Sequence, residues 1–371
     1  MKILQSCGSH SWGGLEMITV DITSKLRDLG HEVSLLCRDN SKLLEEVSQI
    51  GIKAFSILEN NTGILNSILK LRNLLKKNHF DIIHTHLSHD LWTIVPAMKL
   101  SRSKAKLYLT KHMGSGVAKK DVFHKYLYNK VDRIFAVSNY VKDSILETCP
   151  VEQSRVTVLH DAIPVDTFNR NKYDKTSIRK EFELPQNCII AGMVGRITPG
   201  KGHEDLLNAI KKIKEETDKQ IYFVIAGGAS YGEEKYEAEI HSLAAELKIS
   251  DRVIFIGFQK AVSKIMSVMD ILVFPSHLES FGITLLEAMA MEVPIIASNN
   301  AGIPDIIIDG ETGILAPPKD LSALSRAILK LAEDPGLCKK LGTAGRKRVE
   351  ESFNLDVNIL QLEEYYKNQV Q

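Results

Sequence analysis

The stretch H-L-E-S-F-G-I-T-L-L-E-A-M-A, residues 277–290, decides the fold that we expect for this chain. The run before it, D-I-L-V-F-P at 270–275, is rich in branched and aromatic residues and predicts a buried strand. After it, Pro294 ends the predicted helix and 295–297 begin another strand. The stretch therefore predicts a strand, a tight polar turn and a helix that begins near Gly282. In open α/β sheets, ligands bind at such turns, where the strands end.

Two carboxylates lie on either side of this turn, with seven residues between them. Glu279 precedes the predicted helix, and Glu287 lies about 7–8 Å along it at 1.5 Å per residue. The first backbone N–H groups of a helix have no intrahelical partner and attract an anion. A phosphate bound there would have a carboxylate on each side, each able to accept hydrogen bonds from hydroxyl groups. The alternative is that Glu279 is a loop charge and Glu287 a solvated helix residue.

Composition places the chain among globular proteins with two domains. It has 371 residues, of which 44% are hydrophobic and 25% charged. The net charge of +1 offers no global attraction for nucleic acid, so no nucleic-acid partner is expected. No apolar run approaches the roughly 20 residues that cross a bilayer, and the first residues lack the apolar core of a signal peptide. Five scattered cysteines without a C-x-x-C pair indicate neither a disulfide framework nor a zinc site. We therefore expect a cytoplasmic protein.

Short apolar runs alternate with amphipathic segments along the whole chain, which predicts parallel sheets covered by helices. The pattern is interrupted by a polar, aperiodic stretch, so we expect a first α/β domain over 1–168, a linker over 169–187 and a second α/β domain over 188–352. A separate last helix is expected over 353–371. Strands are predicted at 2–5, 31–36, 53–57, 81–83, 106–109, 133–137, 189–194, 222–226, 253–256, 271–274 and 294–297.

A second segment, G-R-I-T-P-G-K-G at 195–202, follows the first predicted strand of the second domain. It places Arg196 and Lys201 at the same end of the sheet as Glu279. Arginine offers a planar fork to phosphate and lysine a mobile point charge. Fixed cations there would lower the barrier for a leaving diphosphate, which gains negative charge as its bond breaks. Alternatively, both are solvated loop cations.

The run E-S-F-G-I-T-L-L-E-A-M-A resembles the glutamate–seven–glutamate motif of retaining GT-B glycosyltransferases, in particular glycosyltransferase family 4. The segment 195–202 resembles the G-R-x-x-x-x-K-G segment of the same family. This resemblance implies two Rossmann-like, doubly wound domains that face each other across a cleft, the first binding the acceptor and the second the nucleotide sugar. It also implies that the last helix crosses back to the first domain. In this family Arg196 and Lys201 would grip the diphosphate, Glu279 would hold sugar hydroxyls and Glu287 would bind the ribose.

Other positions acquire roles through the resemblance. His112, which follows the strand at 106–109, resembles the histidine that contacts the transferred sugar near its anomeric centre; a structural histidine is the alternative. Gly13 and Gly14 suit either a bare tight turn or a loop that closes over a ligand. They do not give the G-x-G-x-x-G spacing of a dehydrogenase. The donor site would further include Gly227, Gly257, Phe258, Ser280, Phe281, Gly282 and Ile283.

No metal or other cofactor is expected. His84, His86 and His89 follow a strand and their spacing could suggest a metal site, but no cysteine cluster or carboxylate accompanies them. The chain also lacks a D-x-D motif at a strand end, as expected for metal-independent transfer. Where many relatives carry an asparagine–glycine pair, this chain has 158–163, V-L-H-D-A-I, so that family contact is not expected here.

We therefore predict a retaining, metal-independent glycosyltransferase that uses a UDP- or GDP-linked sugar. Its acceptor would be a saccharide or lipid-linked molecule of cell-surface polysaccharide, lipopolysaccharide or glycolipid synthesis. A nucleotide-sugar epimerase and an inactive sugar-nucleotide-binding subunit are the alternatives. The first domain is also rich in basic residues, which are either a solvated face or a surface for anionic lipids at the inner face of the membrane. These residues are Lys99, Arg102, Lys104, Lys106, Lys111, Lys119, Lys120, Lys125 and Lys130.

Overall fold

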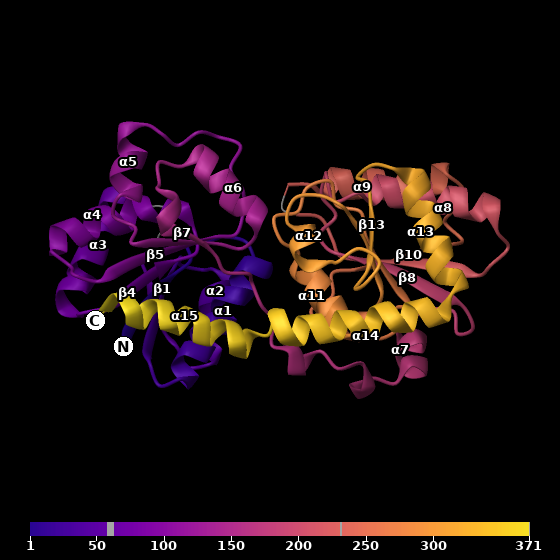
Figure 1. Ribbon diagram of the computed structural model, residues 1–371, viewed down its shortest axis with the longest axis horizontal. Helices are drawn as coiled ribbons and strands as arrows, with labels where there is room; N and C mark the ends of the chain where they lie inside the picture. The colour runs from indigo at the N-terminus through magenta and orange to yellow at the C-terminus, as the bar shows by residue number, and fades with distance from the viewer. Residues whose placement is uncertain (58–62, 231, 371) are drawn as a thin grey trace. The chain divides into compact units, whose positions relative to one another are not determined.

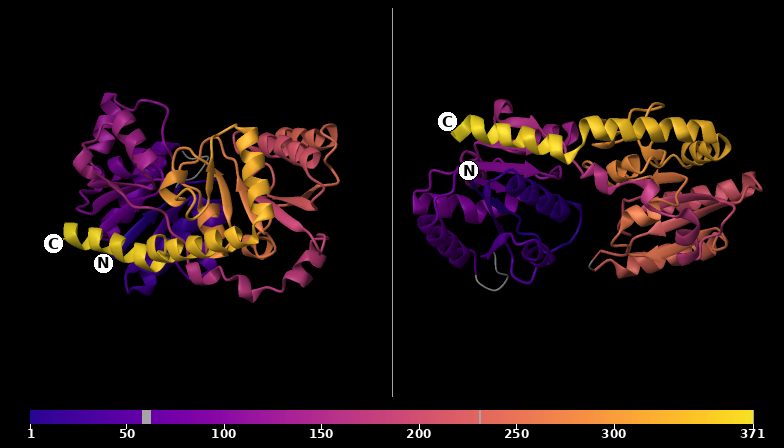
Figure 2. Two further views of the ribbon diagram at one scale, coloured as in Figure 1. Left: turned by 45° about the vertical axis from the view of Figure 1, so that its right-hand side comes forward. Right: turned by 90° about the horizontal axis from the view of Figure 1, so that it is seen from below.

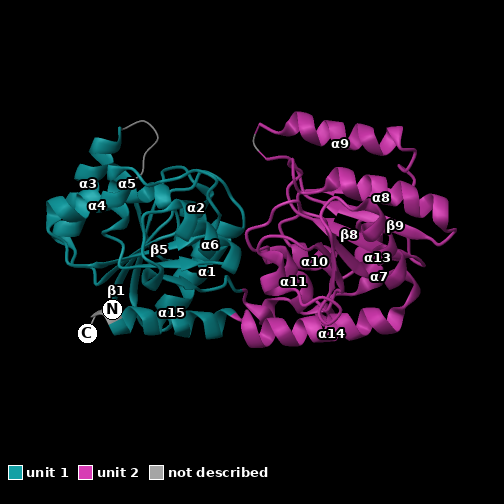
Figure 3. Ribbon diagram, turned by 45° about the horizontal axis from the view of Figure 1, so that its top comes forward, with its two compact units in different colours: residues 1–162, 355–371 teal, residues 163–354 magenta. Residues whose placement is uncertain are grey.

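The structure is a computed structural model that describes residues 1–57, 63–230 and 232–370. It divides into two compact units, which are considered separately (Figures 1 and 3). Unit 1 comprises Met1–Ala162 and Leu355–Gln371, and unit 2 comprises Ile163–Asn354. Gln371, the end of the expected last helix, lies outside the described residues.

Unit 1 contains a parallel sheet of seven strands in the order β3-β2-β1-β4-β5-β6-β7. Its interior strands are largely buried on both faces, as expected when helices cover a parallel sheet on both sides. The predicted strands are all present within one or two residues, and β7 is an additional strand. The strands are β1 (Lys2–Ser6), β2 (Glu32–Cys37), β3 (Lys53–Ser56), β4 (Ile82–Thr85), β5 (Lys106–Lys111), β6 (Arg133–Ala136) and β7 (Val156–Val158).

The helices of unit 1 connect these strands, and the last helix of the chain, α15, returns to the same unit (Figure 2). Several α15 side chains are bonded to the rest of the unit. Lys25 pairs with Asp356 at 2.5 Å, and His31 contacts Glu363 at 2.9 Å. The helices are α1 (Gly14–Asp28), α2 (Lys42–Gln49), α3 (Ile64–Lys77), α4 (Leu91–Ser101), α5 (Val122–Tyr128), α6 (Asn139–Thr148) and α15 (Leu355–Val370).

Unit 2 contains a parallel sheet of six strands in the order β10-β9-β8-β11-β12-β13. Its core lies between this sheet and helices such as α8 and α13, where isoleucine and leucine side chains are almost completely buried. The strands are β8 (Ile189–Val194), β9 (Ile221–Ala226), β10 (Val253–Gly257), β11 (Ile271–Phe274), β12 (Ile295–Ser298) and β13 (Ile314–Ala316). The helices are α7 (Lys175–Glu181), α8 (His203–Glu216), α9 (Glu234–Glu246), α10 (Val262–Met266), α11 (Ile283–Ala290), α12 (Ile303–Ile306), α13 (Leu321–Glu333) and α14 (Pro335–Ser352).

The boundary between the two compact units differs from the domain boundary that we expected from the sequence. The stretch 169–187, expected as a linker, lies within unit 2 and includes α7. Two arginines attach it to that unit: Arg170 donates to the carbonyl oxygens of Ser267 and Met269, and the buried Arg179 pairs with Asp270 at 3.1 Å. These two side chains join the segment to the rest of unit 2.

The helix of the glutamate motif, α11, starts after Gly282 as expected but ends differently. Pro294 was expected to end it, yet the helix stops at Ala290. The chain turns at Glu292, whose φ is 55°, and the Val293 amide donates to the Ala288 carbonyl at 2.9 Å. This is the hydrogen bond of a Schellman turn, which satisfies the last carbonyls of a helix. Pro294 follows the turn and begins the approach to β12.

Candidate functional site

Five loops meet at the carboxyl edge of the unit 2 sheet, because the loops that follow adjacent parallel strands leave the sheet at one edge. Backbone hydrogen bonds join each loop to the next. The pairs are Gly195 N to Ala226 O, Ile197 N to Gly228 O, Gly227 N to Gly257 O, His277 N to Gly200 O and Gly302 N to Glu279 O, at 2.8–3.0 Å. The two motifs of the sequence, 195–202 and 277–290, are thereby held side by side.

Glycine is required where these backbones approach most closely. A Cβ on Gly227 would lie 1.7 Å from the carbonyl oxygen of Gly195. At Gly202, which has a φ of +84°, a Cβ would lie 2.1 Å from the carbonyl oxygen of Pro275. Both approaches are far below van der Waals contact, so a side chain would separate the loops. The glycines of the motifs thus bring the charged side chains together.

Lys201 and Glu279 form an ion pair within this group of loops. Lys201 Nζ lies 2.5 Å from Glu279 Oε2, and the two side chains retain 24% and 17% of their exposure. The ammonium group also lies 5.9 Å from the centre of the Phe274 ring. A charge-assisted contact of this kind is strong, and its partial exposure leaves both groups accessible to a ligand.

Arg196 lies on the neighbouring part of the same edge and is exposed. Its guanidinium donates to Ser230 Oγ at 3.3 Å, in the loop after β9. Nearby, a hydrogen bond from Thr198 lowers the pKa of the Glu233 carboxyl, with further contributions from Ser230 and Arg196. Arg196 is therefore directed across the β8 and β9 loops.

The predicted residues of the helix start have different environments. Gly282 precedes α11, Ile283 is its first residue, and Ser280 lies in the turn. Phe281 is buried and its ring packs against Phe353 with centroids 5.9 Å apart, so its side chain belongs to the core. Glu287 lies on α11 with 6% of its surface exposed. It is not the solvated helix residue of the alternative interpretation.

Two further predicted donor-site residues lie at the end of β10 and directly after it. Gly257 has a φ of +65° and its carbonyl accepts from Gly227. Phe258 is exposed to 72%, an unusual degree for a phenylalanine side chain. Gly257 thus joins the loops, and Phe258 presents an aromatic ring to solvent beside them.

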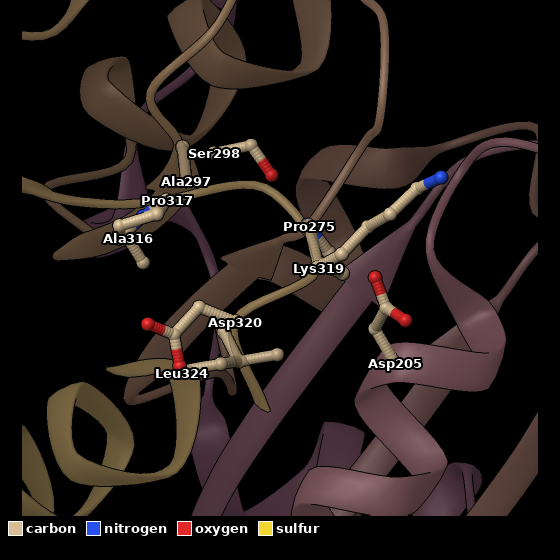
Figure 4. A pocket seen from close by; sticks show the side chains of 9 residues that line it. All are labelled: Asp205, Pro275, Ala297, Ser298, Ala316, Pro317, Lys319, Asp320 and Leu324. Carbon is tan, nitrogen blue, oxygen red and sulfur yellow. The ribbon is translucent and has the colours of Figure 1, made fainter. Parts of the chain in front are cut away.

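A small hollow lies between the ends of β11, β12 and β13 and the first turns of α8 and α13 (Figure 4). Asp205, Ser298, Lys319 and Asp320 provide its polar lining. Asp205 also bonds His277 Nε2 at 2.6 Å, and the Asn300 side chain donates to the His277 carbonyl. These contacts hold the turn that carries Glu279, and the charged residues of both motifs lie outside the hollow's lining.

His112 lies in unit 1, directly after β5, and both of its ring nitrogens have partners. Nδ1 lies 3.1 Å from Asp161 Oδ2, and Nε2 lies 3.2 Å from His86 Nδ1. The side chains of His112 and Asp161 are exposed to only 7% and 9%. Asp161, in the segment that lacks the family's asparagine–glycine pair, supplies the carboxylate that orients the ring.

The histidines considered for a metal site serve other contacts. His84 Nε2 lies 2.8 Å from Thr110 Oγ1, and His86 Nε2 lies 3.0 Å from Gln5 Oε1. Within the part of the chain that the structure describes, no group of three or more His, Cys, Asp or Glu residues is placed to hold a metal ion.

Gly13 and Gly14 lie at the start of α1. Gly13 precedes the helix, and its carbonyl accepts from the Met17 amide at 3.0 Å. A Cβ on Gly13 would lie 3.6 Å from Glu16 Oε2, an ordinary contact. Both interpretations of this glycine pair are compatible with that geometry.

Sequence reasoning did not identify Ser230, His277, Asp205, Asp161 and Gln5 as residues around the sites, and it named His86 without its contact to His112. The position of His277 after a predicted strand was a usable signal, whereas Asp161 follows β7, which was not predicted. No local pattern marks Ser230 or Gln5, because their partners lie 34 and 81 residues away in the chain.

Two family models match consecutive parts of this chain. Residues 12–167 match "Glycosyltransferase Family 4", and residues 174–348 match "Glycosyl transferases group 1". The curated relatives include N-acetyl-alpha-D-glucosaminyl L-malate synthase of Bacillus anthracis, 25% identical over 370 residues, with 96% of this chain and 94% of the relative covered. Capsular polysaccharide biosynthesis glycosyltransferase CapM of Staphylococcus aureus is 28% identical over 235 residues, covering 63% of this chain and 60% of the relative.

Solved structures agree with these matches. A glycosyltransferase from Rickettsia africae ESF-5 has a TM-score of 0.89 and 26% identity, covering 99% of this chain and 98% of that one. Anabaena Alr3699/HepE in complex with UDP-glucose has a TM-score of 0.88 and 20% identity, covering 99% and 100% of the two chains. Among the described residues, no helix combines the length and apolar character needed to cross a bilayer.

Proposed function

We propose that this chain, which is a glycosyltransferase of GT-B architecture, moves a sugar from a nucleotide diphosphate donor to an acceptor hydroxyl with retention of configuration. The Lys201–Glu279 ion pair carries the proposal, because it places a cation and a hydroxyl-binding carboxylate 2.5 Å apart at the edge of the unit 2 sheet. A structural neighbour, Alr3699/HepE, is described with UDP-glucose, so UDP-sugars are the first donors to test.

In this proposal Arg196 and Lys201 meet the diphosphate. The C–O bond between the anomeric carbon and the diphosphate breaks while the acceptor oxygen bonds to the same carbon. The acceptor proton passes to the departing phosphate oxygen, so no further co-reactant is consumed. Negative charge grows on the diphosphate, and fixed cations stabilise it most in the transition state.

The glutamates and His112 bind the rest of the donor. Glu279, at the helix start, would accept hydrogen bonds from sugar hydroxyls, and Glu287, further along α11, would bind the ribose. Gly227, Gly257 and Phe258 would contact the nucleoside. His112 would contact the transferred sugar, with Asp161 holding its ring in place at 3.1 Å.

The acceptor is proposed to be a saccharide or lipid-linked molecule of surface polysaccharide, lipopolysaccharide or glycolipid synthesis. CapM, a relative, is named for capsular polysaccharide biosynthesis, which agrees with this class.

The experiment is a screen of UDP- and GDP-sugars by thermal shift, followed by incubation of stabilising donors with candidate acceptors. Free nucleoside diphosphate and a glycosylated product that appear together support transfer, and the anomeric proton coupling of the product reports retention. A donor isomer without released diphosphate indicates an epimerase instead. Donor binding without any turnover indicates a binding subunit.

We also propose that unit 1 contacts an anionic membrane surface, such as the inner face of a cell membrane. Four large apolar side chains near His112 are exposed, each to 69% or more: Met113, Val117, Val122 and Phe123. Lysines surround them in the sequence, at Lys119, Lys120, Lys125 and Lys130. Apolar side chains next to lysines suit the headgroup region of anionic lipids. Lys111 does not contribute, because it is buried with its ammonium group 3.8 Å from Cys149 Sγ.

Vesicle sedimentation tests this surface. Wild type should bind vesicles with phosphatidylglycerol and not vesicles of phosphatidylcholine alone. Replacing Val122 and Phe123 by serine should weaken binding at least tenfold, whereas Leu65→Ser, at an equally exposed residue of α3, should not. Equal binding by both variants would contradict the assignment.

A further inference from the structure

A series of buried polar side chains links His112 to the last helix of the chain. In the first sheet β1, β4 and β5 are neighbours, and Gln5 on β1 is in register with His84 on β4. Side chains alternate along extended backbone, so His84 and His86 share one face of the sheet, as do Thr110 and His112. The last helix, α15, contributes a tyrosine to this face.

The contacts are continuous from one end to the other. His112 Nε2 lies 3.2 Å from His86 Nδ1, and His86 Nε2 lies 3.0 Å from Gln5 Oε1. Gln5 Nε2 donates to the Tyr366 hydroxyl at 3.4 Å. That hydroxyl lies 2.5 Å from His84 Nδ1. Gln5, His84 and Tyr366 have no exposed surface and His86 has 1%.

The two inner histidines are neutral. Burial lowers the pKa of His84 to about 3 and lowers the pKa of His86 well below its ordinary value. A neutral imidazole has one nitrogen that donates and one that accepts. A ring that accepts a hydrogen bond at one nitrogen must therefore donate from the other nitrogen.

The direction of the Gln5 amide sets which ring nitrogens of His86 and His112 donate. Gln5 presents its carbonyl oxygen to His86, so His86 must donate from Nε2 and accept at Nδ1. His112 must then donate from Nε2. Its Nδ1 faces the Asp161 carboxylate, which accepts a second hydrogen bond. In this arrangement His112 carries both ring protons and a positive charge.

Turning the Gln5 amide by half a turn reverses every donor. His86 would then donate to His112, which would keep a proton on Nδ1 alone, and the Tyr366 hydroxyl would donate to Gln5. Every hydrogen bond is kept, with donor and acceptor exchanged. The two arrangements thus differ by one proton on His112 and by the direction of the Gln5 amide.

We propose that Gln5 and Tyr366 are positioning residues, which couple the protonation of His112 to the last helix through His86. The effect of this coupling on sugar transfer rests on the role proposed above for His112. The coupling of protonation does not depend on that role. The groups that face His112 are Asp161 and His86 directly, with His84 and Tyr366 behind them. Lys111, the preceding residue, is directed to Cys149 instead.

The test uses the full chain without substrate. Nitrogen-15 chemical shifts of the imidazole rings report which nitrogens carry protons, and His112→Gln identifies the His112 signals. In Gln5→Glu the carboxylate, when ionised, can only accept, and His86 must then donate to it. The nitrogen-15 signals of His112 should then move toward those of the doubly protonated ring at constant pH.

Tyr366→Phe removes the hydroxyl that connects Gln5 and His84, so the His112 signals should shift at constant pH. Tyr108→Phe is the matched control, since the Tyr108 hydroxyl donates to the Tyr365 carbonyl at 3.0 Å. It removes a bond from the same sheet to the same helix but lies outside the series. Its His112 signals should match those of wild type.

Unchanged His112 titration in folded Tyr366→Phe and Gln5→Glu would overturn the proposal, and Tyr366→Phe decides alone if Gln5→Glu does not fold. Transfer rates supply a separate readout. The alkaline limb of the pH–rate profile should move upward in Gln5→Glu. Shifted ring signals with an unmoved rate profile would support the coupling and contradict the sugar contact proposed for His112.

Discussion

Lys201 Nζ lies 2.5 Å from Glu279 Oε2, although 78 residues separate them in the chain. The two groups come from the loops after β8 and β11, which are neighbouring strands. Glu279 thus neutralises the ammonium group that we propose to meet the diphosphate. A bound diphosphate would compete with Glu279 for Lys201, and this competition shapes the first two predictions.

Lys201→Ala should lower kcat more than it raises KM, because charge on the diphosphate grows in the transition state. We expect kcat to fall by about 100-fold, as when a single stabilising donor is lost. Steady-state kinetics at saturating acceptor measure the split, with Lys212→Ala, on the same unit, as the control. An unchanged kcat with a raised KM would make Lys201 a binding residue alone.

Glu279→Gln should weaken binding of the intact donor far more than binding of the free nucleoside diphosphate, because only the donor carries the sugar. Loss of a charge-assisted hydrogen bond is worth about 1.5–3 kcal/mol, or roughly tenfold to a hundredfold in affinity. The diphosphate alone should bind equally well or better, since Lys201 no longer has an anionic partner. Calorimetry with both ligands measures the difference.

Glu287→Gln is the matched comparison, and it should weaken both ligands by similar factors because both contain the ribose. Glu287 lies on α11 beyond the helix start that follows Glu279. Equal losses for the two ligands in Glu279→Gln would reverse the proposed orientation of the donor.

Donor turnover should continue in the presence of a chelator, because the proposed site compensates the diphosphate with Arg196 and Lys201. The measurement is release of nucleoside diphosphate with excess EDTA and after adding back magnesium or manganese. Activity lost with chelator and restored by either metal would contradict this prediction.

Gly227→Ala should destabilise unit 2, because its Cβ would lie 1.7 Å from the Gly195 carbonyl oxygen and force the two loops apart. We expect a loss of about 3 kcal/mol, as for an overpacked backbone contact. Gly228→Ala is the control, since a Cβ there would meet only Glu237 Oε1 at an ordinary 3.8 Å. Gly227→Ala should melt at a clearly lower temperature than Gly228→Ala. Equal melting temperatures would show that the loops at Gly195 and Gly227 can move apart at little cost.

Stability should fall as the pH is lowered through the range set by His203. Burial lowers the pKa of this side chain to about 4 from 6.5, so the unfolded chain takes up a proton before the folded chain does. The free energy of unfolding should therefore decrease between pH 6.5 and 4, by up to about 3 kcal/mol. His203→Leu should flatten this dependence, whereas His241→Gln, on the exposed side of α9, should leave it unchanged. Denaturant melts across this range provide the measurement.

The sequence alone was sufficient for the architecture and for the two charged motifs. Apolar runs of four to six residues and amphipathic segments are local patterns. Each could be assigned as a strand or a helix without knowing which other segments it packs against. The strands that sequence reasoning omitted, β7 and β13, have three residues each and only one buried residue apiece, so they lack that pattern. The segment 169–187 was assigned as a linker from its polar composition, which does not reveal that Arg170 donates to backbone carbonyls of unit 2.

The tertiary structure decided which charges meet. Lys201 and Glu279 pair because parallel strands bring distant loops to one edge, and Gly227 is required by the carbonyl of Gly195. The surroundings of His112 depend on longer-range contacts still, since Tyr366 lies 361 residues from Gln5. Local patterns indicate which side chains of a segment are buried. A hydrogen bond between two segments depends instead on where the folded sheet places their ends. The alternation of apolar and polar residues therefore determined the fold, and the packing of the folded units determined the partners of Lys201 and His112.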